Sequence, residues 1–237
     1  MFNPRPQIER LALPGGGVCW VIDGVLSDPQ ALVQWAVQQR AQFGAAGFNA
    51  YPGLEWRMGD EVSGPLNEFF MLHLRSLMGA RRTLSMYSRL SLATLLPAQL
   101  RPLQRLCHRD RMGTDVDQTV AACTLYLFKD SLLGGTSFFV PRLPLAQINA
   151  NMPRWNAMDD AAFTQEIGAE PAYLTASNAF FERVQVVPAA FNRAVFYDGN
   201  QFHSSHIEDP AKLSADPALG RLTLNGFFIC RRSAPSS

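Results

Sequence analysis

Apolar residues follow a helical period in the first third of the chain and an alternating, strand-like period in most of the rest. Ser27 and Pro29 begin the first helical stretch well, because Ser can cap a helix and Pro fits its first turn. We expect this helix to end before Gly44. A second apolar stripe, spaced by three and four residues, predicts a helix over 65–78.

From Thr83 onward, apolar and polar residues alternate in short runs separated by turn residues, which indicates β-strands. The predicted strands are 84–90, 103–110, 120–128, 137–140, 180–187, 193–197, 201–207 and 221–230. Eight strands behind two helices suit an α+β chain that is mainly β, with a double-stranded β-helix, or jelly roll, and N-terminal helices packed on one sheet.

No break in composition divides the chain, so we expect one domain over 1–237. Within it, 1–82 is a helical support region, 83–232 is the jelly-roll core, and 233–237 is a frayed tail. The core contains a long insertion at 141–179, with a helix near 159–167. Such a connection can be a lid over a site or a subdomain that braces the sheet, and the sequence does not separate these.

The stretch 45–64 is rich in glycine and proline, so we expect a loop. Tyr51, Trp56 and Arg57 in this stretch can cover a pocket or simply pack on the core. We favour packing, because loop aromatics commonly cover apolar surface.

The 237 residues carry a net charge of +1, which argues against a general polyanion or nucleic-acid binder. The four cysteines are scattered and no signal peptide is evident, so we expect reduced thiols and a cytoplasmic protein. No apolar run reaches the roughly 20 residues of a membrane span.

The chemistry of the chain centres on His108 and Asp110, which would share one face of a strand because they are two residues apart. Two histidines and one carboxylate form a facial set of ligands for non-haem Fe(II). The third ligand would be His203 or His206. These lie three apart, so they point to opposite sides of a strand, and we choose His203.

Further residues follow His108 and Asp110 in a fixed order along the chain. They are Tyr126-Leu127, Gly134-Gly135-Thr136-Ser137-Phe138, the turn Pro188-Ala189-Ala190-Phe191, Phe202-His203-Ser204-Ser205 and Arg221. Over about 84–231, this ordered set resembles the prolyl-4-hydroxylase-like branch of the 2-oxoglutarate- and Fe(II)-dependent dioxygenases.

The resemblance implies that His108, Asp110 and His203 hold Fe(II). It also implies that Arg221 receives the distal carboxylate of 2-oxoglutarate, a task suited to a bidentate guanidinium, and that Tyr126 adds a hydroxyl. The implied reaction is hydroxylation of an amino-acid residue or small metabolite, with ascorbate as an additional reductant that the resemblance allows.

Three departures from the family pattern matter. Arg221 follows His203 by 18 positions, a longer gap than usual, so 208–220 is a loop insertion or Lys129 replaces Arg221 as the anchor. Phe128 stands where prolyl hydroxylases often carry Asn, and Ala190-Phe191 replaces the usual glycine turn. These differences put prolyl substrates in doubt more than the iron chemistry.

Residues 75–111 contain eight arginines and one acid, Asp110, so this stretch is either a solvated face or a field that attracts acidic substrates. Tyr87 and Arg89 precede the metal residues and are our candidate substrate contacts. Two other functions compete with the oxygenase: a non-catalytic jelly-roll binding module, and a cupin-like metalloenzyme that does not use 2-oxoglutarate.

Overall fold

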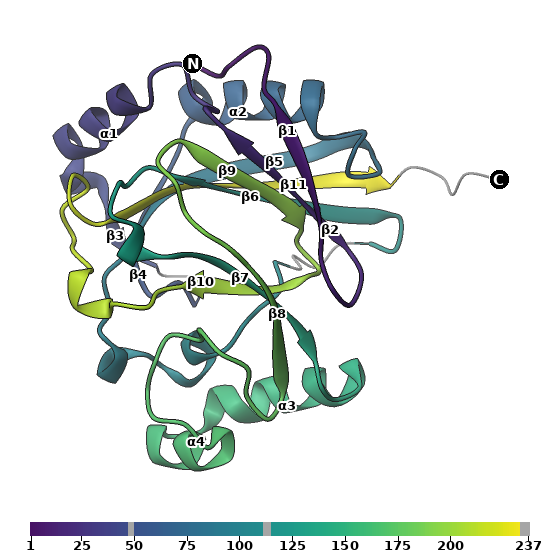
Figure 1. Ribbon diagram of the computed structural model, residues 1–237, viewed down its shortest axis with the longest axis vertical. Coiled ribbons are helices and arrows are strands. Elements are labelled where there is room, and N and C mark those ends of the chain that lie inside the picture. The colour runs from purple at the N-terminus through teal and green to yellow at the C-terminus, as the bar shows by residue number, and fades with distance from the viewer. Residues whose placement is uncertain (47–49, 111–114, 233–237) are drawn as a thin grey trace.

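The structure, a computed structural model, describes residues 1–46, 50–110 and 115–232. Two antiparallel sheets dominate it (Figure 1). Within the described ranges, the larger sheet has the strand order β1-β2-β9-β6-β11-β5-β4-β3, and the smaller has the order β10-β7-β8. The strands of the larger sheet are β1 (Ile8–Ala12), β2 (Val18–Asp23), β3 (Gly44–Ala45), β4 (Gly53–Arg57), β5 (Ala80–Ala93), β6 (Gln118–Tyr126), β9 (Arg193–Asp198) and β11 (Arg221–Arg232). Those of the smaller sheet are β7 (Gly135–Pro141), β8 (Phe181–Val187) and β10 (Phe202–His206).

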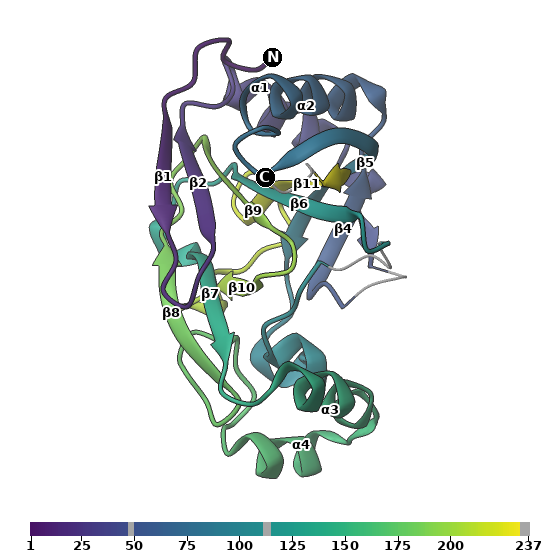
Figure 2. The same ribbon diagram turned by 90° about the vertical axis from the view of Figure 1, so that its right-hand side faces the viewer.

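Two N-terminal helices, α1 (Pro29–Gln38) and α2 (Asp60–His73), cover the outer face of the larger sheet (Figures 1 and 2). Their apolar residues join those of β5, β6, β9 and β11 in one buried cluster. Phe70 of α2, for example, stacks on Phe228 of β11 with ring centroids 4.0 Å apart. Burial of this continuous apolar face is the main driving force that fixes the helices on the sheet.

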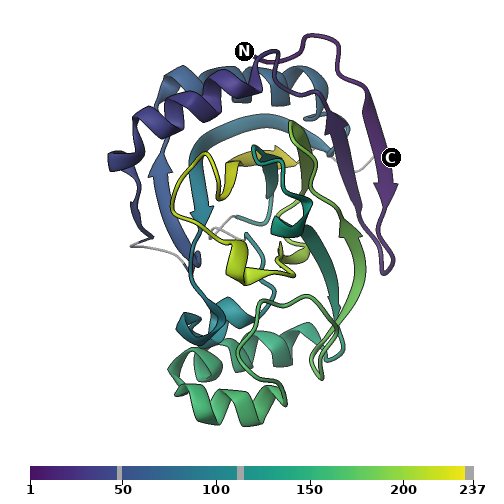
Figure 3. The same cartoon turned by 60° about the vertical axis from the view of Figure 1, so that its left-hand side comes forward.

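The inner face of the larger sheet looks toward the smaller sheet, and the strands of both enclose the interior seen in Figure 3. A separate apolar cluster joins the two sheets there. Helices α3 (Leu145–Ala157) and α4 (Asp160–Ile167) lie beyond the smaller sheet and pack on Phe139, Phe181 and Phe202. The jelly roll with helices on one sheet, as the sequence predicts, is confirmed.

The helices differ from prediction at their ends. The first helix ends at Gln38, and a 3-10 turn, Arg40–Gln42, follows before Gly44. The second begins at Asp60, five residues before the predicted start at Pro65, and ends at His73 instead of 78. Pro65 has no amide N–H to donate to the carbonyl of Glu61. Because Glu61 is exposed near the helix start, water can bond to this carbonyl instead, and the proline is tolerated.

The predicted strand over 103–110 is wrong. Pro102 begins a 3-10 turn, Pro102–Arg105, whose start is capped by Gln104 accepting a hydrogen bond from the Arg101 amide at 2.8 Å. The chain then runs extended as far as Asp110, joined to β10 by one isolated bridge between His108 and His203. Leu103 and Leu106 pack against the α3 region instead of into a sheet.

Strand β4 and helix α3 are among the elements that the sequence does not predict. Strand β4 lies within the expected loop 45–64 and pairs with β5. Helix α3 lies in the 141–179 insertion and contains Pro153. The expected tail 233–237 and Arg111 lie outside the described residues. In the part of the chain that is described, no helix has the length and apolar character needed to cross a membrane.

Candidate metal site and adjoining cavities

His108, Asp110 and His203 meet at one point between the two sheets. One potential ligand atom from each lies within 4.8 Å of the others. His108 Nε2 is 3.5 Å from Asp110 Oδ1, and His203 Nε2 is 3.3 Å from Asp110 Oδ2. Ligand atoms about 2.1 Å from a metal and at right angles to each other lie ~3 Å apart, so the spacing suits adjacent ligands of one ion.

Backbone hydrogen bonds position the three side chains. His108 and His203 exchange amide-to-carbonyl bonds of 2.9 Å in both directions, and the Asp110 amide donates to the Gly199 carbonyl at 2.7 Å. Asp110 packs closely there, because a Cβ at Gly199 would lie 3.1 Å from the Asp110 Cβ. The segment 108–110 therefore follows β10 and the turn before it, which brings residues far apart in sequence together.

The protonation of His203 follows from its neighbours. Its Nδ1 lies 3.0 Å from the Gln201 carbonyl, which can only accept, so Nδ1 carries the proton and Nε2 offers a lone pair toward Asp110. Burial lowers the pKa of His203 from 6.5 to about 4, which keeps the imidazole neutral at pH 7. Burial opposes ionisation of Asp110, but His203, His108 and Arg89 outweigh it and hold the pKa of that carboxyl below its ordinary value.

This arrangement places two hydrogen-bond acceptors, one on His203 and one on Asp110, opposite each other. His203 Nε2 and Asp110 Oδ2 are both acceptors, and Oδ2 is buried with no hydrogen-bond partner in the described ranges. A cation between them would satisfy both groups, which otherwise pay the cost of burial without a partner. The residues present therefore fit a divalent metal held by two imidazoles and one carboxylate.

His206, the alternative third ligand, points to the other side of β10. Its Nδ1 lies 2.8 Å from Ser137 Oγ, and its Nε2 lies 3.1 Å from Glu208 Oε1. Both ring nitrogens are thus engaged away from Asp110. The structure brings His203, and not His206, to the cluster.

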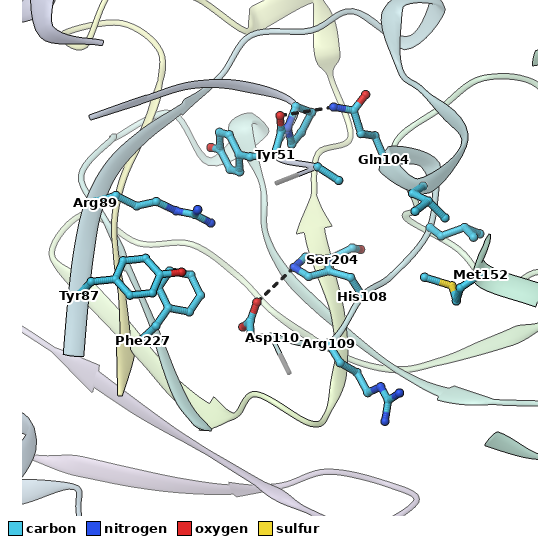
Figure 4. A pocket seen from close by; sticks show the side chains of 14 residues that line it. Tyr51, Tyr87, Arg89, Gln104, His108, Arg109, Asp110, Met152, Ser204 and Phe227 are labelled. Carbon is cyan, nitrogen blue, oxygen red and sulfur yellow. Dashed lines mark hydrogen bonds and ion pairs between the residues drawn. The ribbon is translucent and has the colours of Figure 1, made fainter. Parts of the chain in front are cut away.

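An outer cavity of about 420 Å³ opens in front of His108 and Asp110 (Figure 4). Both predicted substrate contacts, Tyr87 and Arg89 of β5, lie on its wall. The Tyr87 ring stacks on Phe227 at 4.8 Å. The other described residues that line the outer cavity are Ala50, Tyr51, Pro52, Leu103, Gln104, Leu106, Arg109, Met152, Ser204 and Phe227.

A smaller inner chamber, of about 50 Å³, adjoins the outer cavity at Asp110, which borders both, and is also bordered by His203 and Arg221. Arg221 is 2% exposed. Its Nε donates to the Leu133 carbonyl at 3.0 Å, and one Nη donates to the Gly135 carbonyl at 2.8 Å. No carboxylate of the described residues forms an ion pair with it, so a buried positive charge faces the chamber without a counterion.

The floor of the chamber is polar. The Asn225 side-chain amide donates to Ser91 Oγ at 3.1 Å and to Thr223 Oγ1 at 3.0 Å, and its oxygen accepts from Thr124 Oγ1 at 3.2 Å. These hydrogen bonds join three neighbouring strands, β5, β11 and β6. A buried polar floor next to a buried cation suits a small anionic ligand.

The two other predicted anchors occupy different places. The Tyr126 hydroxyl lies 2.7 Å from Thr136 Oγ1, and it is Thr136 that borders the chamber. Burial raises the pKa of Tyr126 to about 12, so its hydroxyl stays neutral. Lys129 is exposed on the outside and lies over the Phe191 ring at 5.2 Å. Of the two candidate basic anchors, Arg221 reaches the chamber.

Sequence reasoning missed Tyr51 and Phe227 as site residues. Both line the outer cavity and the chamber, and both rings contact the Arg89 guanidinium. The assignment of Tyr51 to core packing alone is thus too narrow. A usable signal was present in β11, where Arg221, Thr223 and Asn225 place polar side chains at every second position of an otherwise apolar run.

Comparisons with known proteins give solved structures and one family. The chain is similar to a prolyl-4-hydroxylase from Pseudomonas putida, with 11% identity, coverage of 96% of this chain and 93% of that chain, and a TM-score of 0.41. It is also similar to HygX from Streptomyces hygroscopicus, crystallised with nickel and 2-oxoglutarate, with 13% identity, 89% and 82% coverage and a TM-score of 0.49. A third is SnoN, a non-heme alpha ketoglutarate dependent epimerase from nogalamycin biosynthesis, with 13% identity, 92% and 82% coverage and a TM-score of 0.44.

No curated protein matches the chain. A family of unknown function, DUF6445, matches residues 4–228, which is nearly the whole chain. The protein therefore belongs to the DUF6445 family.

Proposed function

We propose that the protein is an Fe(II)- and 2-oxoglutarate-dependent oxygenase that hydroxylates an amino-acid residue or a small metabolite. One observation carries the proposal: three acceptor side chains that fit a metal lie where an outer cavity meets a chamber bordered by a buried arginine that has no carboxylate partner among the described residues. The two adjoining spaces would take a substrate and a cosubstrate beside one ion.

The donor set is suited to Fe(II). Two imidazoles and one carboxylate on one face of an ion leave its other positions open, which is typical of non-haem Fe(II) oxygenases. His108, Asp110 and His203 would hold that ion. When bound, Fe(II) and 2-oxoglutarate supply the oxidation R–H + O2 + 2-oxoglutarate → R–OH + succinate + CO2.

Arg221 would bind the distal carboxylate of 2-oxoglutarate. The carbonyls of Leu133 and Gly135 hold its Nε and one Nη, which fixes the orientation of the guanidinium. Nη1 has no hydrogen-bond or ion-pair partner in the described part of the chain. A carboxylate there would neutralise the buried charge through charge-assisted hydrogen bonds. Tyr126 would act through Thr136, by orienting its hydroxyl at the chamber wall.

The same residues weigh against the competing functions. A cupin-like enzyme that does not use 2-oxoglutarate has no need of an uncompensated arginine beyond its metal. A binding module without chemistry has no need of facing, unpartnered acceptors. The outer cavity supports a small substrate, because its volume falls in the range of small-molecule sites.

The test is succinate formation from 2-oxoglutarate by anaerobically purified, Fe(II)-loaded protein after exposure to O2. We expect succinate from the wild type and none from His203→Gln. His206→Gln is the matched control, since it alters the same residue type on the same strand but points away from the cluster; it should retain succinate formation. Equal activity in the two variants, or none in the wild type, would contradict the proposal.

A further inference from the structure

Arg89 is held rigidly at the boundary of the outer cavity and the chamber. Its Nε lies 2.9 Å from Glu55 Oε1, and both side chains are largely buried. The guanidinium carbon lies 4.8 Å from the Phe227 ring centroid and 5.7 Å from that of Tyr51. Contacts at Nε and with two rings fix the plane of the guanidinium, so little conformational entropy remains to be lost on binding.

The two terminal nitrogens of Arg89 are left for a ligand. In the described ranges they have no hydrogen-bond or ion-pair partner, and the guanidinium points into the outer cavity toward His108 (Figure 4). A guanidinium edge with two parallel N–H groups matches the two oxygens of a carboxylate.

The rest of the cavity wall has two characters. Among the described residues of the wall, Arg89 and Arg109 are the cationic ones, and the one carboxylate is Asp110, which belongs to the metal cluster. Leu103, Leu106 and Met152 form an apolar side, and Met152 lies across the cavity from Arg89, with His108 between them (Figure 4). A molecule spanning the cavity would therefore have an anionic end and an apolar end.

We propose that the outer cavity binds a small organic acid, with its carboxylate on the terminal nitrogens of Arg89 and its apolar body against Leu103, Leu106 and Met152. This inference rests on the proposed function, under which the carbons between the two ends would face the metal. The substrate class is thus an amphipathic monocarboxylate, and Arg89 is its specificity-determining residue.

The probes are 3-phenylpropionate and octanoate, each compared with its primary amide, which has nearly the same shape but no charge. Binding is measured by isothermal titration calorimetry with the metal-free protein, and again with Zn(II) and saturating 2-oxoglutarate, where no turnover occurs. We expect at least one acid to bind about tenfold or more tightly than its amide, the difference expected for a charge-assisted pair. Equal affinity of acids and amides would overturn the proposal.

Substitution of Arg89 alone would remove the cation that lies 2.9 Å from the buried Glu55 carboxylate, so the test variant is the double change Arg89→Gln with Glu55→Gln. It should abolish the preference for the acid and change 2-oxoglutarate affinity by less than about threefold. The matched control, Arg109→Gln, removes the other arginine of the wall and should keep the preference. If Arg109→Gln abolishes the preference, or if the double variant loses 2-oxoglutarate instead, Arg89 does not have this role.

The design separates the two hypotheses. If acids are preferred through Arg89 but 2-oxoglutarate does not bind with any divalent metal, the proposed function fails and the acid site stands. If 2-oxoglutarate binds and is turned over but no acid is preferred, the acid site fails and the oxygenase stands.

Discussion

Along most of β11, the two faces of the larger sheet are both buried but chemically opposite. Leu222, Leu224 and Phe228 face the helices and join the main core. On the alternate positions, Arg221, Thr223 and Asn225 face the chamber, although they too are at most 9% exposed. Since neighbouring residues of a strand point to opposite sides, one alternating segment builds both a core and a site.

Burial alone therefore does not identify a core. Apolar burial stabilises the fold, whereas buried polar groups cost free energy unless they are paired. The chamber face is paired with itself through Asn225, whereas, within the described residues, Arg221 forms no ion pair and the nearby Asp110 Oδ2 has no hydrogen-bond partner. The helix face should therefore govern stability, and the chamber face should govern ligand binding.

The largest effect is expected on the helix face. Phe228→Ala removes a fully buried ring that stacks on Phe70, and we expect the free energy of unfolding to fall by about 3–5 kcal/mol. Urea denaturation measures the loss. The matched control is Phe227→Ala, the next residue on the cavity face, which should lose clearly less because its ring lines a cavity. Equal losses of unfolding free energy in the two variants would show that both faces contribute equally to stability.

On the chamber face, Arg221→Gln should weaken 2-oxoglutarate binding by about 100-fold, since it removes the charge of a buried carboxylate pair. Its free energy of unfolding without ligand should change little or rise, because a buried charge without a counterion is removed. Calorimetric titration and urea denaturation of the same samples measure both quantities. Unchanged 2-oxoglutarate affinity would remove Arg221 from the site.

A smaller effect is expected for the polar floor. Asn225→Ala deprives Ser91, Thr223 and Thr124 of their shared partner, so we expect a loss of about 1–3 kcal/mol in the free energy of unfolding. Chemical denaturation of the apo protein gives this value. The control Ser91→Ala removes one partner of the network and should cost less. A loss in Asn225→Ala as large as in Phe228→Ala would mean that this face also carries stability.

The smallest effect is expected at the rim of the sheet, where Arg193 donates to both oxygens of Asp23. Hydrogen bonding to Arg193 holds the pKa of Asp23 below its ordinary 3.8. The stabilisation is therefore present above pH 3.8 and is lost as the pH falls through the lower folded-state pKa. Because Asp23 is 65% exposed, Asp23→Asn should cost less than about 1 kcal/mol at pH 7. Denaturation at pH 7 and below pH 3 should show the difference between variant and wild type disappearing in acid.

Much of the fold could be predicted because alternation marks strands strongly, and seven of the eight predicted strands coincide with strands of the structure. The exception, 103–110, contains apolar residues that pack on α3 from a 3-10 turn, and local pattern cannot distinguish this from a strand. Helix α3 was missed because Pro153 argues against a helix, and β4 because glycine and proline surround it.

That His108, Asp110 and His203 lie together could be predicted from their order and chemistry, although His108 and Asp110 come together for a different reason. They lie on an extended segment bonded to β10 and Gly199, not on a regular strand. Tyr51 and Glu55 could not be assigned to the site, because their contacts with Arg89 depend on how β4 lies beside β5. Such tertiary contacts leave no local signal in the sequence.

The most direct test of the central claim is anaerobic equilibrium dialysis of isotopically labelled 2-oxoglutarate against the protein, with and without Fe(II). Our account predicts one molecule of 2-oxoglutarate per chain, with affinity that falls sharply when the metal is left out or when His203 is changed to Gln. No binding, or binding that is equally tight without metal, would contradict the claim that the chamber and the three ligands form one site.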